Sequence, residues 1–351
     1  MESKFLNQIF LKLNKEKIEF CVERNYEGYP NIITGDIDLI VKSKDFFATK
    51  KSIFLVAKRL NWKNYIDYST NQACHFGFYN QNNTNRFVLV IELFNGGTYK
   101  GLNFLSAETI LKKRIPVKSF YKSCSTDELI ITLIHHLFYN NKVFIKYRER
   151  ILNNFIDDPI LVEKKLSYIL NKSLSKKICK SIKQKKWNEI EQISAKAKLV
   201  FFIKSLIYNP IKSLKGIITT YYDIKFKPKG IIIHLSSGIK DKTFLAKKMI
   251  EFATNYHIFI PPQKKIFFLE NKIEYDKIDS VISSGGIAIL IDNKKNRSEN
   301  IFNSYEKFIN ISSNNDTLTL NYKSKVEEIS DLTLINIEKL VWNKILLLIS
   351  K

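Results

Sequence analysis

Cysteine is scarce in this sequence, and the few cysteines are far apart. The chain has four, at Cys21, Cys74, Cys124 and Cys179. No two of them stand at the spacing of a zinc site, and they do not form the dense pattern of a disulfide framework. Their distribution therefore argues against a disulfide-stabilised secreted domain and indicates a protein of the reducing cytoplasm.

Long apolar runs are missing as well. A membrane-spanning helix needs roughly 18 consecutive apolar residues. The nearest candidate, 199–208, is interrupted by Lys204 and is followed by Asn209 and Pro210. The N-terminal segment MESKFLNQIF begins like an amphipathic helix, and no apolar core of a signal peptide follows it. We therefore expect neither a membrane span nor secretion.

Acidic residues are few relative to basic ones. The 351 residues include 34 Asp and Glu against 57 Lys and Arg, a net charge of +23. Such a charge attracts nucleic acid, anionic lipid or phosphorylated glycans. Binding to an anionic membrane or glycan would place the protein at the inner face of the membrane. The alternative is a solvated lysine-rich surface, because an AT-rich genome enriches Lys, Asn and Ile together.

The composition and the order of patterns predict an α/β protein in three parts. Hydrophobic residues make up 45% of the chain, which is globular and long enough for more than one domain. Residues 1–155 predict an α+β domain with a mixed sheet. Residues 156–226 predict a basic helical connector. Residues 227–351 predict a domain with a parallel sheet, and the segment KFKPKG at 225–230 marks the boundary before it.

Individual elements follow from periodicity. The expected strands are 18–23, 36–42, 73–79, 87–94, 230–235 and 286–292. The expected helices outside the connector are 43–62, 107–114, 126–139 and 242–253.

Two aspartates carry the clearest chemical signal. Asp36 and Asp38 stand two apart in an expected strand, so their side chains point to the same face. Two carboxylates held side by side repel each other unless a cation neutralises them, and Mg²⁺ prefers such oxygen ligands. Glu92 interrupts another apolar strand and supplies a third carboxylate, the number that two-metal chemistry uses.

The alternative for this motif is an edge strand with a polar face. Gly35 before the pair, the apolar run after it and the second acidic strand at Glu92 favour a catalytic site instead.

The segment 19–41 (EFCVERNYEGYPNIITGDIDLIV) resembles the core of the polymerase-beta-type nucleotidyltransferases, in particular the bacterial branch found with surface-polysaccharide genes. The segment 99–111 (YKGLNFLSAETIL) resembles another part of that branch, and the likeness covers about the first 150 residues. The resemblance implies that Asp36, Asp38 and Glu92 hold Mg²⁺ or Mn²⁺. It also implies an NTP as substrate, and a small molecule or glycan precursor as acceptor.

One departure concerns the phosphates of the nucleotide. The superfamily usually has Gly-Ser or Gly-Gly before the acidic strand, where this chain reads VERN at 22–25. Arg24 can supply charge in place of backbone amides. The candidate phosphate-binding residues of the first domain are Arg24, Asn25, Gly35, Lys146 and Arg148.

Lys146 and Arg148 belong to a basic cluster with Lys142 and Arg150, after a helix that carries His135 and His136. Basic side chains at the end of such a helix can hold phosphate. The alternative is a solvated face with a favourable helix dipole, and one buried and one surface histidine.

The third part contains a damaged phosphate loop. A working loop reads G-x-x-x-x-G-K-[ST], and Lys242 and Thr243 are in register with its end. Ser236 and Asp241 replace the two glycines, and the aspartate places negative charge where a phosphate would bind.

This part resembles the thymidylate-kinase-like domain that follows the nucleotidyltransferase in similar proteins. The segment 285–293 (GGIAILIDN) resembles a strand of that family that ends in Asp-Arg, with Asn293 in place of the arginine. About 60 residues remain after it, too few for the usual lid. The resemblance implies a kinase-like fold without phosphoryl transfer; a chance Lys-Thr after a strand is the alternative.

Three functions are compatible with these features. The first is a nucleotidyltransferase, which the intact pair of Asp36 and Asp38 favours. The second is a non-catalytic scaffold in polysaccharide assembly, with both nucleotide sites degenerate. The third is a nucleic-acid-processing enzyme of the same superfamily, which ranks last because no RNA-binding motif accompanies the charge.

Overall fold

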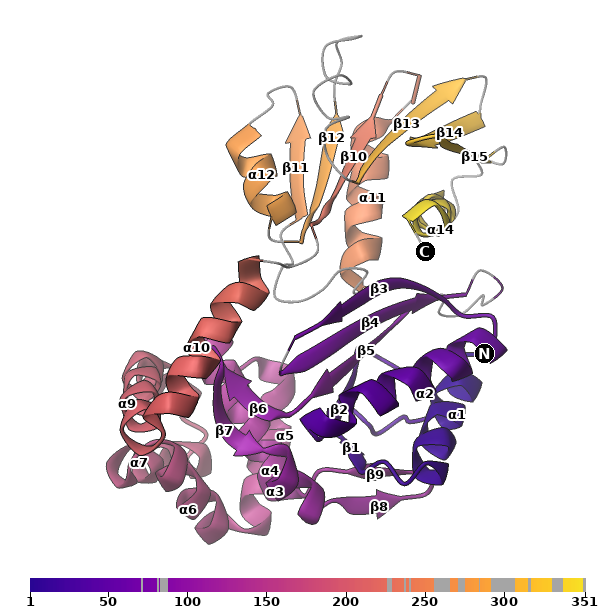
Figure 1. Cartoon of the computed structure of the whole chain (residues 1–351). Helices are drawn as coiled ribbons and strands as arrows, with labels where there is room; N and C mark the ends of the chain where they lie inside the picture. Colours follow the sequence, from indigo (N-terminus) through magenta and orange to yellow (C-terminus); the bar gives the residue numbers. More distant parts are fainter. Residues whose placement is uncertain are drawn as a thin grey trace.

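The computed structural model describes residues 1–70, 72–80, 82, 88–225, 229–236, 238–239, 241–255, 266–270, 275–283, 285–291, 307–314, 317–329 and 337–349. Within them the chain is a mixed α/β protein with two larger sheets, each containing parallel and antiparallel pairs (Figure 1). No helix in this described part is long and apolar enough to cross a membrane.

The first sheet has the strand order β3-β4-β5-β2-β1-β9-β8. Its strands are β1 (Phe20–Val22), β2 (Ile37–Val41), β3 (Lys63–Ser69), β4 (Ala73–Tyr79), β5 (Val88–Phe94), β8 (Ile115–Val117) and β9 (Phe120–Lys122). Strand β2 pairs parallel with β5 and antiparallel with β1. Alternate residues such as Leu39, Phe76 and Ile91 pack on one face against α1 (Glu2–Lys15) and α2 (Phe46–Arg59, after the 3-10 turn Ser43–Asp45).

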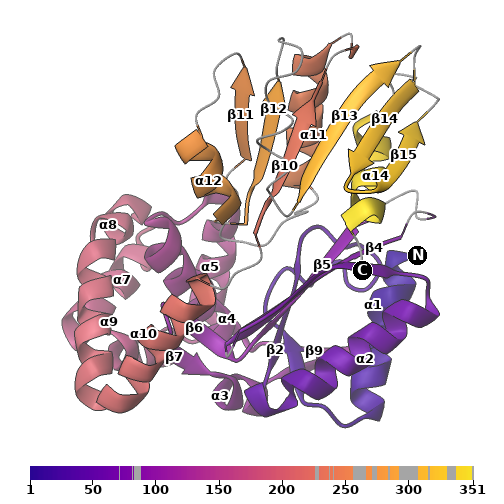
Figure 2. The same ribbon diagram turned by 45° about the horizontal axis from the view of Figure 1, so that its top comes forward.

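Helices lie beyond the other face of this sheet and pack largely on one another (Figure 2). They are α3 (Ala107–Lys112), α4 (Ser125–His135), the π turn His136–Asn140, α5 (Ile145–Asp157), α6 (Pro159–Ile169), α7 (Lys172–Lys183), α8 (Trp187–Gln192) and α9 (Ser194–Tyr208). Ile40 of the sheet shares one core with Leu166 of α6 and Ile190 of α8. The core is thus continuous across residue 155, where the sequence suggested a boundary.

Helix α10 (Pro210–Lys225) lies against the hairpin of β6 (Gly96–Tyr99) and β7 (Leu102–Ser106). The contact is a crossing of two glycines. A Cβ on Gly101, whose φ is +85°, would lie 2.0 Å from the carbonyl oxygen of Gly216. Only glycine permits this approach. The hydroxyl of Tyr68 donates to the carbonyl oxygen of Asp223 at 2.6 Å, which ties α10 to β3 as well.

The second sheet has the order β11-β12-β10-β13-β14-β15. Its strands are β10 (Ile231–Leu235), β11 (Ile266–Glu270), β12 (Ile287–Ile291), β13 (Phe308–Asn314), β14 (Thr317–Tyr322) and β15 (Lys325–Ile329). Helices α11 (Lys242–Asn255) and α14 (Ile337–Ile349) cover one face and α12 (Tyr275–Ser283) the other. The four strands from β11 to β13 in this order are parallel.

This second sheet differs from the expected parallel one at its edge. Strands β14 and β15 pair antiparallel, β14 with β13 and β15 with β14. A short turn at Lys323, with φ at +53°, joins β14 to β15. Such turns connect antiparallel neighbours, whereas parallel neighbours need a longer crossover.

Candidate functional site

Four titratable residues lie in one row across the first sheet. Strand pairing puts His75 opposite Glu92, and Glu92 opposite Asp38. The backbone N–H of Glu23, directly after β1, donates to the carbonyl oxygen of Asp38 at 2.9 Å. Residues directly opposite each other in a sheet have their side chains on the same face. The row therefore lies on the face turned away from α1 and α2.

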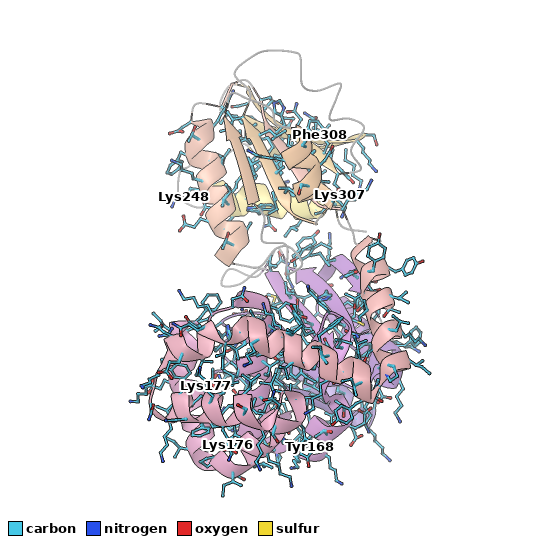
Figure 3. The ribbon with its side chains drawn as sticks, turned by 90° about the vertical axis from the view of Figure 1, so that its left-hand side faces the viewer. Tyr168, Lys176, Lys177, Lys248, Lys307 and Phe308 are labelled. Carbon is cyan, nitrogen blue, oxygen red and sulfur yellow. The ribbon has the colours of Figure 1, made fainter. Side chains whose placement is uncertain are left out.

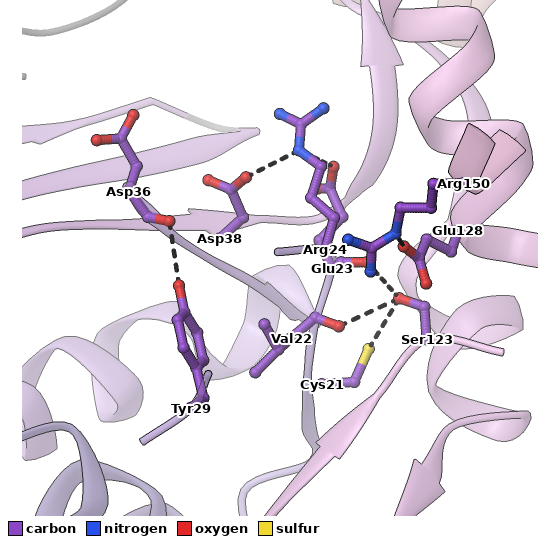
Figure 4. A network of polar contacts seen from close by, with 10 residues as sticks. All are labelled: Cys21, Val22, Glu23, Arg24, Tyr29, Asp36, Asp38, Ser123, Glu128 and Arg150. Carbon is purple, nitrogen blue, oxygen red and sulfur yellow. Dashed lines mark hydrogen bonds and ion pairs between the residues drawn. The ribbon is translucent and has the colours of Figure 1, made fainter. Parts of the chain in front are cut away.

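Asp38 is buried, with 4% of its surface exposed, and Arg24 neutralises it. Arg24 Nε lies 3.1 Å from Asp38 Oδ2 and 3.6 Å from Glu23 Oε1. Asn25 has a φ of +59°, a left-handed conformation that Asn tolerates, and turns the chain directly after Arg24. Figure 4 shows the two terminal nitrogens of Arg24 pointing away from Asp38. The contacts of Arg24 with Asp38 and Glu23 are made through Nε.

Glu92 has a histidine partner. His75 Nδ1 lies 2.9 Å from Glu92 Oε1, and both side chains are largely buried. The His75 ring stacks on Tyr68, with centroids 5.9 Å apart. Tyr68 is the residue bonded to α10, so β3, β4 and α10 together hold the orientation of Glu92. His75 could not be predicted as a site residue, because its role depends on the pairing of β4 with β5.

Two carboxyl groups of the row, Asp38 and Glu23, have raised pKa values. Burial raises the pKa of Asp38 to about 6, although Arg24 opposes the shift. Burial raises the pKa of Glu23 to about 7, and repulsion by Asp38 and Glu92 contributes, again against Arg24. One arginine thus serves two buried carboxyls. A further cation at this place would stabilise their charged forms.

Asp36 and Gly35 precede the row at the start of β2. Asp36 is half-buried, and its backbone carbonyl accepts a hydrogen bond from the Tyr29 hydroxyl at 3.3 Å. Its carboxylate stands beside that of Asp38 along the chain (Figure 4). A Cβ placed on Gly35 would meet nothing within 4 Å, so the space next to this glycine is open.

The loop that carries Arg24 is fixed by residues far along the chain. The Ser123 hydroxyl contacts the carbonyl oxygens of Val22 and Glu23 at 3.3 and 3.2 Å. The Tyr26 hydroxyl donates to Glu128 of α4 at 2.7 Å, and Arg150 of α5 forms an ion pair with the same carboxylate. These contacts, drawn in part in Figure 4, span about 100 residues of sequence, so no local pattern could have predicted them.

The donor set suits Mg²⁺ or Mn²⁺ in its chemistry, since Asp36, Asp38 and Glu92 offer hard carboxylate oxygens. Among the residues that the structure describes, no three His, Cys, Asp or Glu side chains are already grouped as a metal site. Arg24 and His75 are the groups that contact Asp38 and Glu92. A metal ion at Asp38 would therefore share this carboxylate with Arg24, whose Nε contacts Oδ2.

The other basic candidates lie outside this row. Arg148 donates to Glu191 and to the carbonyl oxygen of Val143, both at 3.0 Å, and so joins α5 to α8. Lys146 is exposed, with its ammonium 4.8 Å from the centroid of the Tyr147 ring. Neither side chain has a contact with Asp38 or Glu92 in the structure.

His135, at the end of α4, and His136, which begins the π turn after it, are neutral at physiological pH. Burial lowers the pKa of His135 to about 3 and that of His136 to about 4. The nearby charge of Arg24 lowers both further. His136 is buried and His135 is partly exposed. Both rings are thus near enough to Arg24 to be affected by its charge, and they are themselves uncharged.

The phosphate-loop candidate lies between β10 and α11. Lys242 and Thr243 begin α11, and Asp241 Oδ1 accepts a hydrogen bond from the Phe244 amide at 2.8 Å. Ser236 is bonded to the carbonyl oxygen of Ile311 through its amide and its hydroxyl, at 2.8 and 3.0 Å. A helix N-terminus is a natural anion site. Here a carboxylate of the protein already caps it.

The related segment 285–293 is only partly described. Ile287–Ile291 forms β12 as expected, whereas Asp292 and Asn293 lie outside the described residues.

Comparisons with known proteins identify neither a family nor a function for this chain. No family model matches the chain, and no curated protein matches it. A crystal structure of JHP933 from Helicobacter pylori is similar over 63% of this chain and 90% of that chain, with 11% sequence identity and a TM-score of 0.30. A TM-score this low carries no argument about fold or function.

Proposed function

We propose that the first sheet and its helices form a metal-dependent nucleotidyltransferase. It would transfer a nucleoside monophosphate from an NTP to a small-molecule or glycan-precursor acceptor. The observation that carries the proposal is the register of β2 with β5, which puts Asp38 opposite Glu92 on neighbouring parallel strands. The resemblance of segment 19–41 to nucleotidyltransferases supports it. The link to surface polysaccharide comes from that resemblance alone.

Residues in and beside the row have distinct roles in this reaction. Asp36, Asp38 and Glu92 would hold Mg²⁺ or Mn²⁺, which supplies Lewis-acid stabilisation of the phosphate charge when bound. The terminal nitrogens of Arg24 bind phosphate oxygens in place of the missing glycine amides. An acceptor oxygen forms a bond to the α-phosphorus, and the bond from that phosphorus to pyrophosphate breaks.

The proton of the acceptor hydroxyl goes to Glu92 in this scheme. His75 holds the Glu92 carboxylate through its 2.9 Å contact and so positions the base. Pyrophosphate leaves with the electron pair of the broken bond, and cationic groups such as Arg24 stabilise its charge.

The second sheet is proposed to have no phosphoryl-transfer activity. The Asp241 carboxylate caps the helix that would receive a phosphate, and Ser236 is bound to β13. This unit would serve docking or substrate presentation.

Thermal stability measured with each of the four NTPs, with and without Mg²⁺, tests the proposal. A site filled at about 100 times its dissociation constant adds roughly 2.7 kcal/mol. We expect a Mg²⁺-dependent shift with at least one NTP, absent in Asp36→Asn/Asp38→Asn. If no NTP shifts the wild type, the scaffold function replaces the enzyme.

A further inference from the structure

Helices α9 and α10 expose an apolar surface on the outside of the molecule. The residues concerned are apolar, at least 39% exposed, and contributed by both helices: Leu199, Phe202, Ile203, Ile207, Tyr208, Ile211, Leu214, Ile218, Tyr221 and Tyr222. We name these ten the α9–α10 surface. Ile207 and Ile211 are 71% and 84% exposed, values unusual for isoleucine.

The exposed residues form a stripe on each helix. In α9 they recur at 199, 202, 203 and 207, and in α10 at 211, 214, 218 and 221–222, which is the spacing of one helix face. The opposite faces are used by the fold. Phe201 of α9 is buried in the core, and Gly216 of α10 lies against Gly101. The stripes are therefore the helix faces that do not pack against the rest of the chain.

The charge around these stripes is mainly positive, with Asp223 as the one acidic residue of α9 and α10. Residues 192–222 contain no Asp or Glu and carry Lys196, Lys198, Lys204, Lys212 and Lys215. The same side of the molecule presents α7, where Lys176 and Lys177 point outward (Figure 3). Further lysines exposed on α7 and just after it are Lys172, Lys180, Lys183, Lys185 and Lys186.

We propose that the α9–α10 surface docks onto an anionic lipid membrane. Helices of this kind lie in the interface with their apolar face among the acyl chains and their basic residues at the headgroups. Tyrosine suits this boundary, since its ring is apolar and its hydroxyl polar, and lysine stems extend to the headgroups. No helix of the described chain can span a bilayer, so the contact is peripheral.

A second copy of the chain fits this surface less well. Two such surfaces placed face to face would bring lysines opposite lysines, with only Asp223 of each copy as an acidic residue on α9 and α10. Anionic headgroups instead neutralise the same charges, and each lysine near such a surface strengthens binding roughly fivefold.

Membrane docking would place the candidate site beside the bilayer. Helix α10 contacts β3 through Tyr68, whose ring stacks on His75 of the site row. An acceptor held in the membrane would then meet the site without diffusing through bulk water. Docking itself does not depend on the proposed chemistry, because it rests on the α9–α10 surface alone.

Vesicle sedimentation of the full chain tests the proposal. The probes are vesicles of phosphatidylcholine alone and vesicles with phosphatidylglycerol at about one lipid in four. The variant Ile207→Ser/Ile211→Ser/Leu214→Ser removes exposed apolar contacts without touching the core, so it should fold normally. We expect wild type to sediment with the anionic vesicles, and the variant to bind at least about tenfold more weakly.

A matched control is Ile32→Ser/Phe47→Ser, which removes equally exposed apolar residues (63% and 80%) from another part of the chain. It should bind like wild type. A second variant, Lys176→Gln/Lys177→Gln/Lys212→Gln/Lys215→Gln, should weaken binding to anionic vesicles and reduce its dependence on salt.

Two results would overturn the proposal. One is equal sedimentation of wild type and the Ile207 variant. The other is absence of vesicle binding together with a wild-type dimer that the same variant converts to a monomer, since this assigns the surface to a second copy. Because vesicle binding is measured without nucleotide, either result is distinguishable from failure of the proposed reaction.

Discussion

The sequence suggests nucleotide binding at two places, and these differ in whether side chains of the protein already occupy the groups that would bind an anion. At the row on the first sheet, buried carboxyls share one arginine whose terminal nitrogens point away from them. At the start of α11, the carboxylate of Asp241 occupies the amide that an anion would use. At the first place the terminal nitrogens of Arg24 are directed away from the carboxylates and could contact a ligand. At the second place the Asp241 carboxylate already accepts the hydrogen bond that a bound anion would accept. A motif is thus judged by what its groups already contact.

The largest effect should follow removal of Arg24, which contacts two carboxylates of the row. Arg24→Gln leaves Asp38 buried without its partner, which typically costs about 3 kcal/mol of unfolding free energy. Adding Mg²⁺ should recover part of this loss, because a cation can then reach Asp38. Urea unfolding with and without Mg²⁺ measures both effects. Arg59→Gln, an exposed arginine bonded to Gln8, is the matched control and should change little. A loss of equal size in both variants would contradict this account.

The next largest effect is a dependence of stability on pH, caused by the buried carboxyl group of Glu23. The folded pKa of Glu23 is about 7, above its usual 4.5, so the folded state keeps a proton that the unfolded state has lost between these values. The contribution of Glu23 to stability therefore falls as pH rises from 4.5 to 7. Glu23→Gln should remove this loss, stabilising the protein at pH 8 by on the order of 2 kcal/mol and hardly at pH 4.5. Unfolding curves across this range would show it. A variant that is destabilised equally at both pH values would refute it.

A smaller effect is expected at the second place. Asp241→Ala removes the cap of α11 and should cost about 1 kcal/mol. Asp241→Asn keeps an oxygen acceptor without the charge and should cost a few tenths. Neither variant should gain a nucleotide-dependent thermal shift. A shift gained by Asp241→Asn would show that charge alone separates the two places, and would weaken the comparison.

The smallest effect on stability should come from Gly35→Ala. A Cβ there meets no atom within 4 Å, and the substitution should change unfolding free energy by less than about 0.5 kcal/mol. If nucleotide occupies the open space beside Asp36, the same variant should weaken NTP binding measured by thermal shift. Unchanged NTP binding would locate the nucleotide elsewhere along the row.

Local patterns predicted much of the framework. The strand expected at 73–79 forms at Ala73–Tyr79, and that expected at 36–42 forms at Ile37–Val41. The helix expected from Lys242 begins there. Edge elements were harder: β3 (Lys63–Ser69) was not predicted, because the adjacent apolar residues Tyr65 and Ile66 and an irregular register interrupt its alternation.

The site was predictable only in part. Asp38 and Glu92 stand out as carboxylates in apolar strands, and the structure brings them into register. The partners His75 and Ser123 could not be found in this way, because strand pairing and long-range hydrogen bonds place them. Arg148 shows the converse, since its ion pair with Glu191 depends on how α5 meets α8. Charge in a sequence suggests a ligand, but only packing shows whether that charge is already used.

The most direct test of the central claim is a titration with Mn²⁺ followed by the EPR signal of the free ion. Wild type should remove about one equivalent of Mn²⁺ from solution, more tightly when an NTP is present. Asp38→Asn should abolish this binding, and Asp241→Ala should leave it intact. Binding that survives Asp38→Asn, or no binding by the wild type with any NTP, would contradict the assignment of the acidic row as a metal-nucleotide site.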